Sequence, residues 1–392
     1  MSYAKDRIMY DADSHIMELP DFLQVHAEPK DREVVPEISF GSAAGSGIDR
    51  DLHEYIQAGH KHDAQKVVEL SALGDDILRG PKGYQALGAF NNEDRPAVLD
   101  MLGFKKQLVF ASFSTGIVFR HDRPKLEYAA SRAHNRGMAE FCSIDSRLLG
   151  VGAIPLDDVE QAMRELEFAM DAGLEAIWIP HRHCGGRSPG HDDLDPFWAR
   201  LTEADIPFVL HVGGSPLQLD PEWMNTGRPV PTDWGGGGEN VRGKDMTALH
   251  QTAERFLSVM MLDGVFDRHP NLRGACVELG AGWVPQMLDR LNWVVDIWSK
   301  SDEALRNLSA KPSELARRHL SFTPYVYEDI GKMIQQSNAD LYLFSSDYPH
   351  TEGGRNPLGR FDTSLANAEI AVSEQQKFFA DNFLRVFPRA GQ

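Results

Sequence analysis

Eight short apolar runs are spread along the 392 residues of this chain, and segments with apolar residues at helical spacing separate most of them. Strands that alternate with helices build a parallel sheet from β-α-β units. Eight strands close a (β/α)8 barrel, so the pattern predicts an α/β protein with the TIM-barrel fold. The predicted strands are residues 7–13, 107–112, 148–154, 176–180, 207–212, 273–279, 320–324 and 341–347.

One connection breaks this alternation. Residues 14–106 separate the first two predicted strands, which is far more than an ordinary loop needs. Residues 95–103 have the pattern of the first barrel helix, so we expect a large insertion after strand one, at about residues 20–92. We expect it to act as a lid or small subdomain, because long loops at this end of a barrel are usually functional. The rest of the chain, 1–392, is expected to form a single domain.

Charge and composition exclude several functions. The chain has 40 Lys plus Arg against 58 Asp plus Glu, a formal net charge of −18, which disfavours binding to nucleic acid or to an anionic membrane. No stretch approaches the roughly 20 apolar residues of a membrane span, and no signal peptide is visible. Cys142, Cys184 and Cys276 are too scattered for a disulfide framework. We therefore expect a cytoplasmic protein that acts on a small molecule.

Carboxylates and imidazoles close several predicted strands. Asp13 and His15 end the first, His211 the fifth, Glu278 the sixth and Asp347 the eighth. The carboxyl ends of barrel strands share one face, and residues two apart on a strand point to the same side. We therefore predict that these five side chains bind one or two divalent metal ions. Nitrogen and oxygen ligands without a thiolate suit Zn²⁺, Mn²⁺ or Fe²⁺.

The motifs around these residues resemble those of a known family. DADSHIME at strand one, ELGAGWVPQMLDRL at strand six and FSSDYPHTEG at strand eight resemble the amidohydrolase superfamily, in the branch of aminocarboxymuconate-semialdehyde decarboxylase. The resemblance implies a metal site of His-x-His, a strand-five histidine and a strand-eight aspartate, which map onto Asp13, His15, His211 and Asp347. Asp13 replaces the first histidine, and Glu278 stands where decarboxylases of this branch often have a catalytic histidine. The resemblance also implies a homo-oligomer, most simply a dimer.

The two extra carboxylates favour a highly charged metal centre, and such centres generate a nucleophile from bound water. The leading prediction is therefore a metal-dependent hydrolase of a thioester, ester or amide, and a diiron thioesterase on this fold is a candidate relative. Asp347 would take the proton from water. His250 would stabilise the oxyanion or bind metal, and His350 would orient Asp347 or contact the substrate.

Two alternatives remain open. In a non-oxidative decarboxylase, the metal would hold the substrate carboxylate while Asp347 protonates the carbon that loses CO₂. A barrel without catalytic activity would serve only in ligand binding or assembly. Residues 181–183 (His-Arg-His) are read either as ligands or as a salt-bridged rim, and Glu18 as a hydrogen-bonding partner of a ligand.

Overall fold

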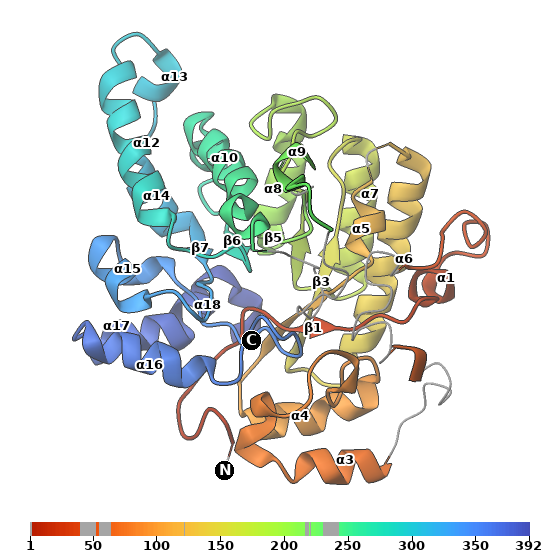
Figure 1. Cartoon of the computed structure of the whole chain (residues 1–392). Helices are drawn as coiled ribbons and strands as arrows, with labels where there is room; N and C mark the ends of the chain where they lie inside the picture. The colour runs from red at the N-terminus through yellow and green to blue at the C-terminus, as the bar shows by residue number, and fades with distance from the viewer. Residues whose placement is uncertain are drawn as a thin grey trace.

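The computed structural model describes residues 2–39, 52–54, 64–120, 122–215, 219, 221–229 and 243–392. In this part of the chain, seven strands form one parallel sheet in the order β1 to β7, each paired with the next (Figure 1). The strands are β1 His15–Ile16, β2 Gln107–Ala111, β3 Leu148–Ala153, β4 Ala176–Trp178, β5 Phe208–His211, β6 Gly274–Val277 and β7 Leu320–Phe322. The predicted α/β class is confirmed.

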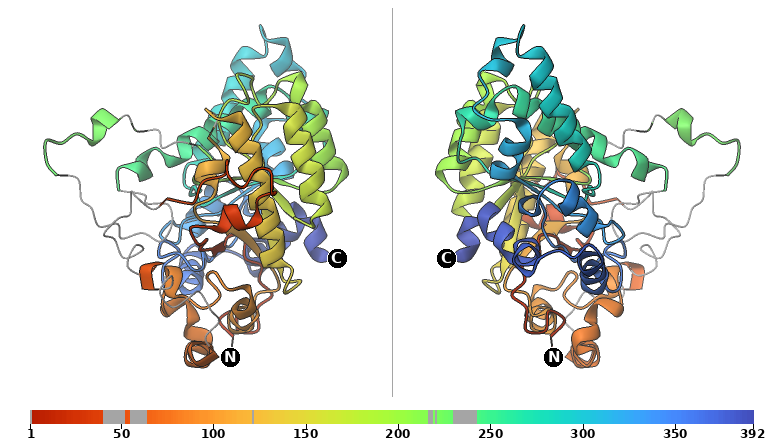
Figure 2. Two further views of the ribbon diagram at one scale, coloured as in Figure 1. Left: turned by 90° about the vertical axis from the view of Figure 1, so that its right-hand side faces the viewer. Right: turned by 90° about the vertical axis from the view of Figure 1, so that its left-hand side faces the viewer.

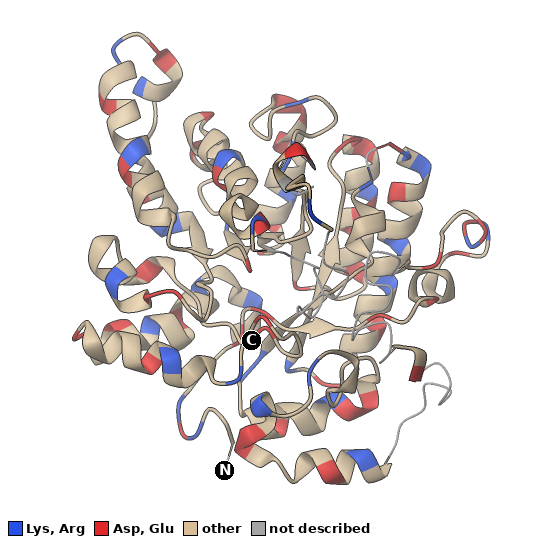
Figure 3. Ribbon diagram, viewed as in Figure 1, with Lys and Arg blue, Asp and Glu red and all other residues tan. Residues whose placement is uncertain are grey.

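Helices surround this sheet. The longer ones are α3 Ala64–Ser71, α4 Arg95–Leu102, α6 Pro124–Cys142, α7 Val159–Asp171, α8 Asp195–Glu203, α10 Leu249–Leu262, α12 Val284–Trp298, α14 Pro312–His319, α15 Ile330–Gln336 and α16 Pro357–Asn367. The shorter ones are α1 Phe22–His26, α5 Thr115–Val118, α9 Pro221–Met224, α11 Val265–Arg268, α13 Glu303–Arg306, α17 Val372–Gln376 and α18 Asn382–Val386. Acidic and basic residues are interspersed along these helices (Figure 3). No helix among the described residues is long and apolar enough to cross a membrane.

Strand residues are buried on both faces of the sheet. Phe110 and Val209 belong to an inner cluster, while their chain neighbours Val109 and Leu210 pack in a second cluster that includes the surrounding helices. A strand covered on both sides needs apolar residues at every position, so it appears in the sequence as a continuous apolar run. This explains why β2 to β7 lie within one or two residues of their predicted bounds.

The first and eighth predicted strands differ from expectation. The regular part of the first is β1, beyond the predicted 7–13, in which Asp11 forms a single parallel bridge with Gln107. Residues 341–348 also form single parallel bridges, Tyr342 with Phe322 and Tyr348 with Ser14. Backbone bonds join the two segments, Ala12 N to Phe344 O at 3.0 Å and Asp347 N to Asp13 O at 2.9 Å. The Asp11 carboxylate adds to them, because it accepts hydrogen bonds from the Ser346 backbone nitrogen at 2.7 Å and from its hydroxyl at 2.6 Å. The segment 341–348 thus lies between β7 and the N-terminal segment without being a regular strand.

The predicted insertion contains α1, α3 and the short 3₁₀ turns Gly74–Arg79, Gly83–Gln85 and Asn92–Asp94. Helices α3 and α4 lie at one end of the molecule, opposite α12 and α13 (Figure 2). Three hydrogen bonds join the insertion to the strand ends: Gly83 N to Pro349 O at 2.9 Å, Tyr348 Oη to Leu87 O at 2.7 Å and Met17 N to Ala89 O at 2.6 Å. Residues 40–51 and 55–63 lie outside the described residues, and the lid role stays a prediction.

Candidate metal centre

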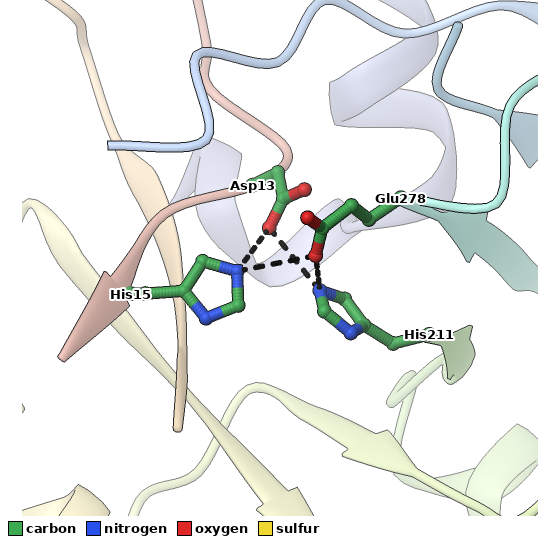
Figure 4. Close-up of side chains that lie close together, drawn as sticks. All are labelled: Asp13, His15, His211 and Glu278. Carbon is green, nitrogen blue, oxygen red and sulfur yellow. Dashed lines mark hydrogen bonds and ion pairs between the residues drawn. The ribbon is translucent and has the colours of Figure 1, made fainter. Parts of the chain in front are cut away.

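Four side chains from three strand ends converge at the carboxyl edge of the sheet. Asp13 precedes β1 and His15 begins it, His211 is the last residue of β5, and Glu278 follows β6 directly. Figure 4 shows the two imidazoles and the two carboxylates facing one another. Asp347 reaches the same place from the segment 341–348, whose backbone is held by a hydrogen bond from Asp347 N to Asp13 O at 2.9 Å.

The distances between these groups are those of a ligand shell. Nε2 of His15 lies 3.1 Å from Asp13 Oδ1, 3.6 Å from Glu278 Oε2 and 3.6 Å from Asp347 Oδ1. Nε2 of His211 lies 3.4 Å from Asp13 Oδ1 and 3.1 Å from Glu278 Oε2. Two overlapping groups, Asp13-His15-His211-Glu278 and His15-Glu278-Asp347-His350, each keep their ligand atoms within 4.8 Å of one another.

These atoms are buried without sufficient hydrogen bonds. Nε2 of His15, Oε2 of Glu278 and Oδ1 of Asp347 have no hydrogen bond of good geometry within the described residues, and all three side chains are at most 8% exposed. Burying such groups costs free energy unless a hydrogen bond or a metal ion satisfies them. The donor set, two imidazoles and three carboxylates, therefore fits a divalent cation with nitrogen and oxygen ligands.

Two of the carboxylates sit on strained backbone. Glu278 and Asp347 both have φ of 54°, in the left-handed region that residues other than glycine avoid at a cost of about 1–2 kcal/mol. Hydrogen bonds hold Glu278 there, since its backbone nitrogen donates to Thr323 Oγ1 at 2.9 Å. Strained residues of this kind cluster at functional sites, because the turn aims the side chain inward where a regular strand would not.

The electrostatics of the cluster favour a cation. Burial tends to lower the pKa of His15 and of His211, but the carboxylates of Asp13 and Glu278 outweigh it and hold both pKa values well above the usual range. Burial tends to raise the pKa of Glu278, but the two imidazoles hold it below its usual range. The positive charge that protons would bring to the histidines is the charge that a divalent metal supplies.

Neighbouring groups orient the ligands. Nδ1 of His211 lies 2.9 Å from Val212 O, which fixes the proton on Nδ1 and leaves Nε2 facing the cluster. His181, after β4, bonds His211 O through Nε2 at 3.1 Å and Thr252 through Nδ1 at 2.8 Å. Burial lowers the pKa of His181 to about 4, so it supports the end of β5 as a neutral imidazole.

The structure places His350 beside Asp347 and places His250 elsewhere. Nδ1 of His350 lies 3.2 Å from Asp347 Oδ1, and its Nε2 lies 2.7 Å from Ser112 Oγ. His250 is the second residue of α10, where its Nε2 lies 3.8 Å from Glu254 Oε2 and its ring stacks on Trp283 with centroids 5.7 Å apart. His250 belongs to neither candidate ligand group.

The remaining predicted residues have structural partners. Arg182 forms ion pairs with Asp157 at 2.7 Å and with Glu127 at 3.3 Å. These ion pairs agree with the interpretation of this residue as part of a salt-bridged rim. His183 is exposed. The carboxylate of Glu18 accepts hydrogen bonds from three successive backbone nitrogens after β2, residues 112–114, at 2.8 to 3.2 Å. Glu18 therefore fixes the loop that carries Ser112.

Sequence reasoning missed Lys82. Its ammonium is buried without a hydrogen-bond partner in the described part of the chain, and Asp347 is among the charged groups that act on it. A lysine between a proline and a glycine in a long insertion carries no signal of this position, which tertiary contacts decide.

A cavity of about 300 Å³ opens beside the cluster. Its lining combines three aliphatic side chains, two tyrosine rings and three glutamates, and one of these, Glu278, connects it to the candidate metal ligands. The lining residues are Val212, Met246, Leu249, Glu278, Tyr325, Tyr327, Glu328 and Glu352. Its size and its aromatic walls suit a small planar molecule.

A parallel α/β fold that gathers imidazoles and carboxylates at its strand ends defines the class of metal-dependent amidohydrolase-type enzymes. The family described as Amidohydrolase matches residues 89–389, so this chain belongs to that family.

Similar proteins agree with this assignment. Gamma-resorcylate decarboxylase from Rhizobium radiobacter is 31% identical over 250 residues, which are 58% of this chain and 68% of the relative. An amidohydrolase from Mycobacterium avium subsp. paratuberculosis K-10 superposes with a TM-score of 0.71 at 20% identity, over 98% of this chain and 100% of that one. A manganese-containing 5-carboxyvanillate decarboxylase from Novosphingobium aromaticivorans superposes with a TM-score of 0.61 at 18% identity, over 99% and 98%.

These findings confirm a divalent metal cofactor and correct the predicted reaction. The relatives matched by sequence are decarboxylases, so the leading prediction of a hydrolase is wrong, and none of them supports a thioesterase. The error has a physical origin. Carboxylate and imidazole ligands at a barrel mouth serve both water activation and carboxylate binding, so the ligand types alone do not separate the two reactions.

Proposed function

We propose that this protein is a metal-dependent, non-oxidative decarboxylase of a small aromatic carboxylate. Its fold would be a (β/α)8 barrel in which the segment 341–348 takes the position of the eighth strand. The observation that carries the proposal is the buried cluster around His15, in a chain whose 31%-identical relative is a decarboxylase. The aromatic cavity beside Glu278 supports a ring-bearing substrate.

Asp13, His15, His211, Glu278 and Asp347 would hold the metal ion, for which manganese is a candidate, because manganese is bound in the related 5-carboxyvanillate decarboxylase. When bound, the ion supplies the positive charge that fixes the substrate carboxylate and an adjacent oxygen. Two ionised carboxylates, Asp13 and Glu278, would balance the charge of a divalent ion.

Asp347 is the proposed proton donor. Burial raises the pKa of its carboxyl to about 7, with the nearby Glu278 carboxylate as a further cause, so before a cation binds this group can carry a proton near neutrality. The proton passes to the ring carbon that bears the carboxylate. The bond to the carboxylate carbon then breaks, its electron pair returns to the ring and CO₂ leaves. His350, 3.2 Å from Asp347 Oδ1, orients the carboxyl, which regains its proton from solvent.

The test is turnover of 2,6-dihydroxybenzoate by the manganese-loaded protein in D₂O. We expect one CO₂ per molecule of substrate and one deuterium on the product carbon that carried the carboxylate. In water enriched in ¹⁸O, the organic product should contain no solvent oxygen. Release of no CO₂ from this acid or from 5-carboxyvanillate, or solvent oxygen in the product, would contradict the proposal.

We also infer that the enzyme is cytoplasmic and forms a homodimer. The exposed apolar residues Trp293, Ile297 and Trp298 on α12 support self-association, since large exposed apolar groups on one helix favour a protein contact.

A further inference from the structure

The carboxylate of Glu328 joins the loop after β6, which begins at the candidate metal ligand Glu278, to the loop after β7. Its Oε2 accepts hydrogen bonds from the backbone nitrogens of Tyr325 at 2.8 Å and of Ala281 at 2.9 Å. Its Oε1 accepts a third, from the backbone nitrogen of Gly282 at 2.8 Å. Hydrogen bonds to a carboxylate are stronger than those between neutral groups, so this contact fixes the two loops against each other.

Two glycines after Glu278 make room for this contact. A Cβ on Gly282 would lie 2.8 Å from Glu328 Oε1. A Cβ on Gly280, where φ is 66°, would lie 2.8 Å from the ring of Tyr325. Such distances are too short for a Cβ, so both positions need glycine. The sequence Glu-Leu-Gly-Ala-Gly at residues 278–282 therefore forms a turn that fits closely around the groups of the loop after β7.

The loop after β7 also holds Glu278 itself, at both of its peptide groups. The backbone nitrogen of Glu278 donates to Thr323 Oγ1 at 2.9 Å, and its backbone oxygen accepts a hydrogen bond from Tyr325 Oη at 3.0 Å. Both bonds act on a residue whose φ of 54° is unfavourable for any residue other than glycine. Glu328 belongs to neither candidate ligand group, yet it fixes the backbone of the tyrosine that holds Glu278.

We propose that Glu328 is a positioning residue for the metal ligand Glu278, and that it acts through Tyr325 and the turn at residues 280–282. The proposal rests on the proposed function, which assigns Glu278 to the metal, and adds the groups that keep this ligand in place. Glu328 and Tyr325 also line the cavity beside Glu278. The same two side chains therefore form part of the cavity wall and support the ligand.

The test is a calorimetric titration of the full chain, freed of metal by a chelator, with Mn²⁺ and without any substrate. Glu328→Gln replaces one acceptor oxygen by an NH₂ group, so at least one of the three backbone nitrogens loses its acceptor. We expect manganese to bind about 10- to 100-fold more weakly, as is usual when a group behind a metal ligand is removed. Tyr325→Phe removes only the bond to Glu278 O and should weaken binding about 3- to 10-fold.

Two matched controls change the same kinds of group away from the metal centre. Asp302→Asn alters a carboxylate that accepts hydrogen bonds from two backbone nitrogens at the start of α13. Tyr128→Phe removes a hydroxyl that donates to backbone oxygens at 3.0 and 3.2 Å. Both variants should bind Mn²⁺ as tightly as the wild type does.

The EPR spectrum of the bound Mn²⁺ separates positioning from a general loss of stability. The spectrum depends on the symmetry of the ligands around the ion, which a less stable protein with the same ligand geometry leaves unchanged. We expect an altered spectrum for Glu328→Gln and for Tyr325→Phe, and the wild-type spectrum for both controls. Wild-type affinity and spectrum in Glu328→Gln would overturn the proposal. If that variant does not fold, the same result in Tyr325→Phe overturns it.

Metal binding needs no turnover, so the two proposals can fail separately. Weaker manganese binding in Glu328→Gln, with no CO₂ released by the wild type, would refute the proposed reaction and leave the role of Glu328 intact. Release of CO₂ by the wild type, with unchanged manganese binding in both variants, would refute the role of Glu328 alone.

Discussion

At the scale of single residues, Asp347 combines two properties that usually belong to different groups. It lies among the candidate metal ligands, and burial raises its pKa to about 7. Asp347→Asn keeps the shape of the side chain and one of its oxygens but removes the proposed proton donor. We expect kcat to fall by about 10²- to 10⁴-fold with manganese still bound. Elemental analysis of the metal content and an assay of CO₂ release test this prediction. An unchanged kcat in the variant would show that Asp347 is not the proton donor.

His250 provides a contrast at the same scale. It contacts Glu254 and Trp283, away from both ligand groups. We therefore expect His250→Ala to change kcat by less than about 10-fold, far below the effect expected of a general acid or base. Parallel kinetics of this variant and of Asp347→Asn measure the difference. A decrease in kcat as large as that of Asp347→Asn would show that His250 takes part in catalysis.

At the scale of elements, the loop after the segment 341–348 packs tightly against it. A Cβ on Gly353 would clash with the backbone oxygen of Ser346 and would lie 2.8 Å from Asp347 Cβ. Gly353→Ala must therefore displace the backbone that aims Asp347. We expect a loss of about 1–3 kcal/mol in the free energy of unfolding, together with weaker manganese binding.

Gly116, in α5, is the matched control, because nothing lies within 4 Å of a Cβ placed there. Denaturant unfolding and metal titration of both alanine variants test the argument. Equal behaviour of the two would mean that the loop after Asp347 adapts freely.

The element scale also shows what the sequence can predict. Strands β2 to β7 were predictable because burial on both faces makes each a run of apolar residues. The first and eighth predicted strands were placed less well, because these segments pair through isolated bridges and through the side chains of Asp11 and Ser346 instead of a continuous ladder. Isolated hydrogen bonds of this kind produce no regular pattern of apolar residues in a sequence.

The candidate site was predictable for a related reason. Asp13, His15, His211 and Glu278 are polar residues that interrupt or end apolar runs, so they stand out once the strands are placed. Lys82 could not be predicted, since hydrogen bonds between distant segments decide where it lies. The reaction could not be predicted either, because hydrolysis and decarboxylation use the same kinds of ligand.

At the scale of the whole molecule, a buried histidine links stability to pH. Burial lowers the pKa of His134 to about 4, while the unfolded chain has a pKa near 6.5. The unfolded state therefore binds more protons between these values, and stability falls as the pH drops from about 6.5 toward 4, by about 1.4 kcal/mol per pH unit.

His134→Gln lacks this titration, so its loss of stability relative to the wild type should shrink as the pH falls, by less than about 1.4 kcal/mol from pH 7 to 6 and by close to that amount from pH 6 to 5. Urea unfolding of both proteins at pH 7, 6 and 5 measures the difference. A constant gap across this range would show that His134 is not buried as a neutral group.

Assembly is tested at the same scale. Trp293 is 48% exposed and Trp298 49% exposed on α12, which lies at the end of the molecule away from α3 and α4 (Figure 2). We expect a dimer by light scattering and a monomer for the variant with both tryptophans changed to glutamate, because buried charges oppose an apolar contact. A wild-type monomer at micromolar concentration would refute the expected dimer.

The pairing of the N-terminal segment with residues 341–348 limits where the polypeptide can be shortened for expression. The matched family region begins at residue 89, yet Asp13, His15 and β1 come before that boundary. A recombinant fragment trimmed to the matched region would carry His211, Glu278 and Asp347 but would leave one flank of the sheet uncovered. A gene cut at the family limits would thus encode a protein without two of the five candidate metal ligands, Asp13 and His15.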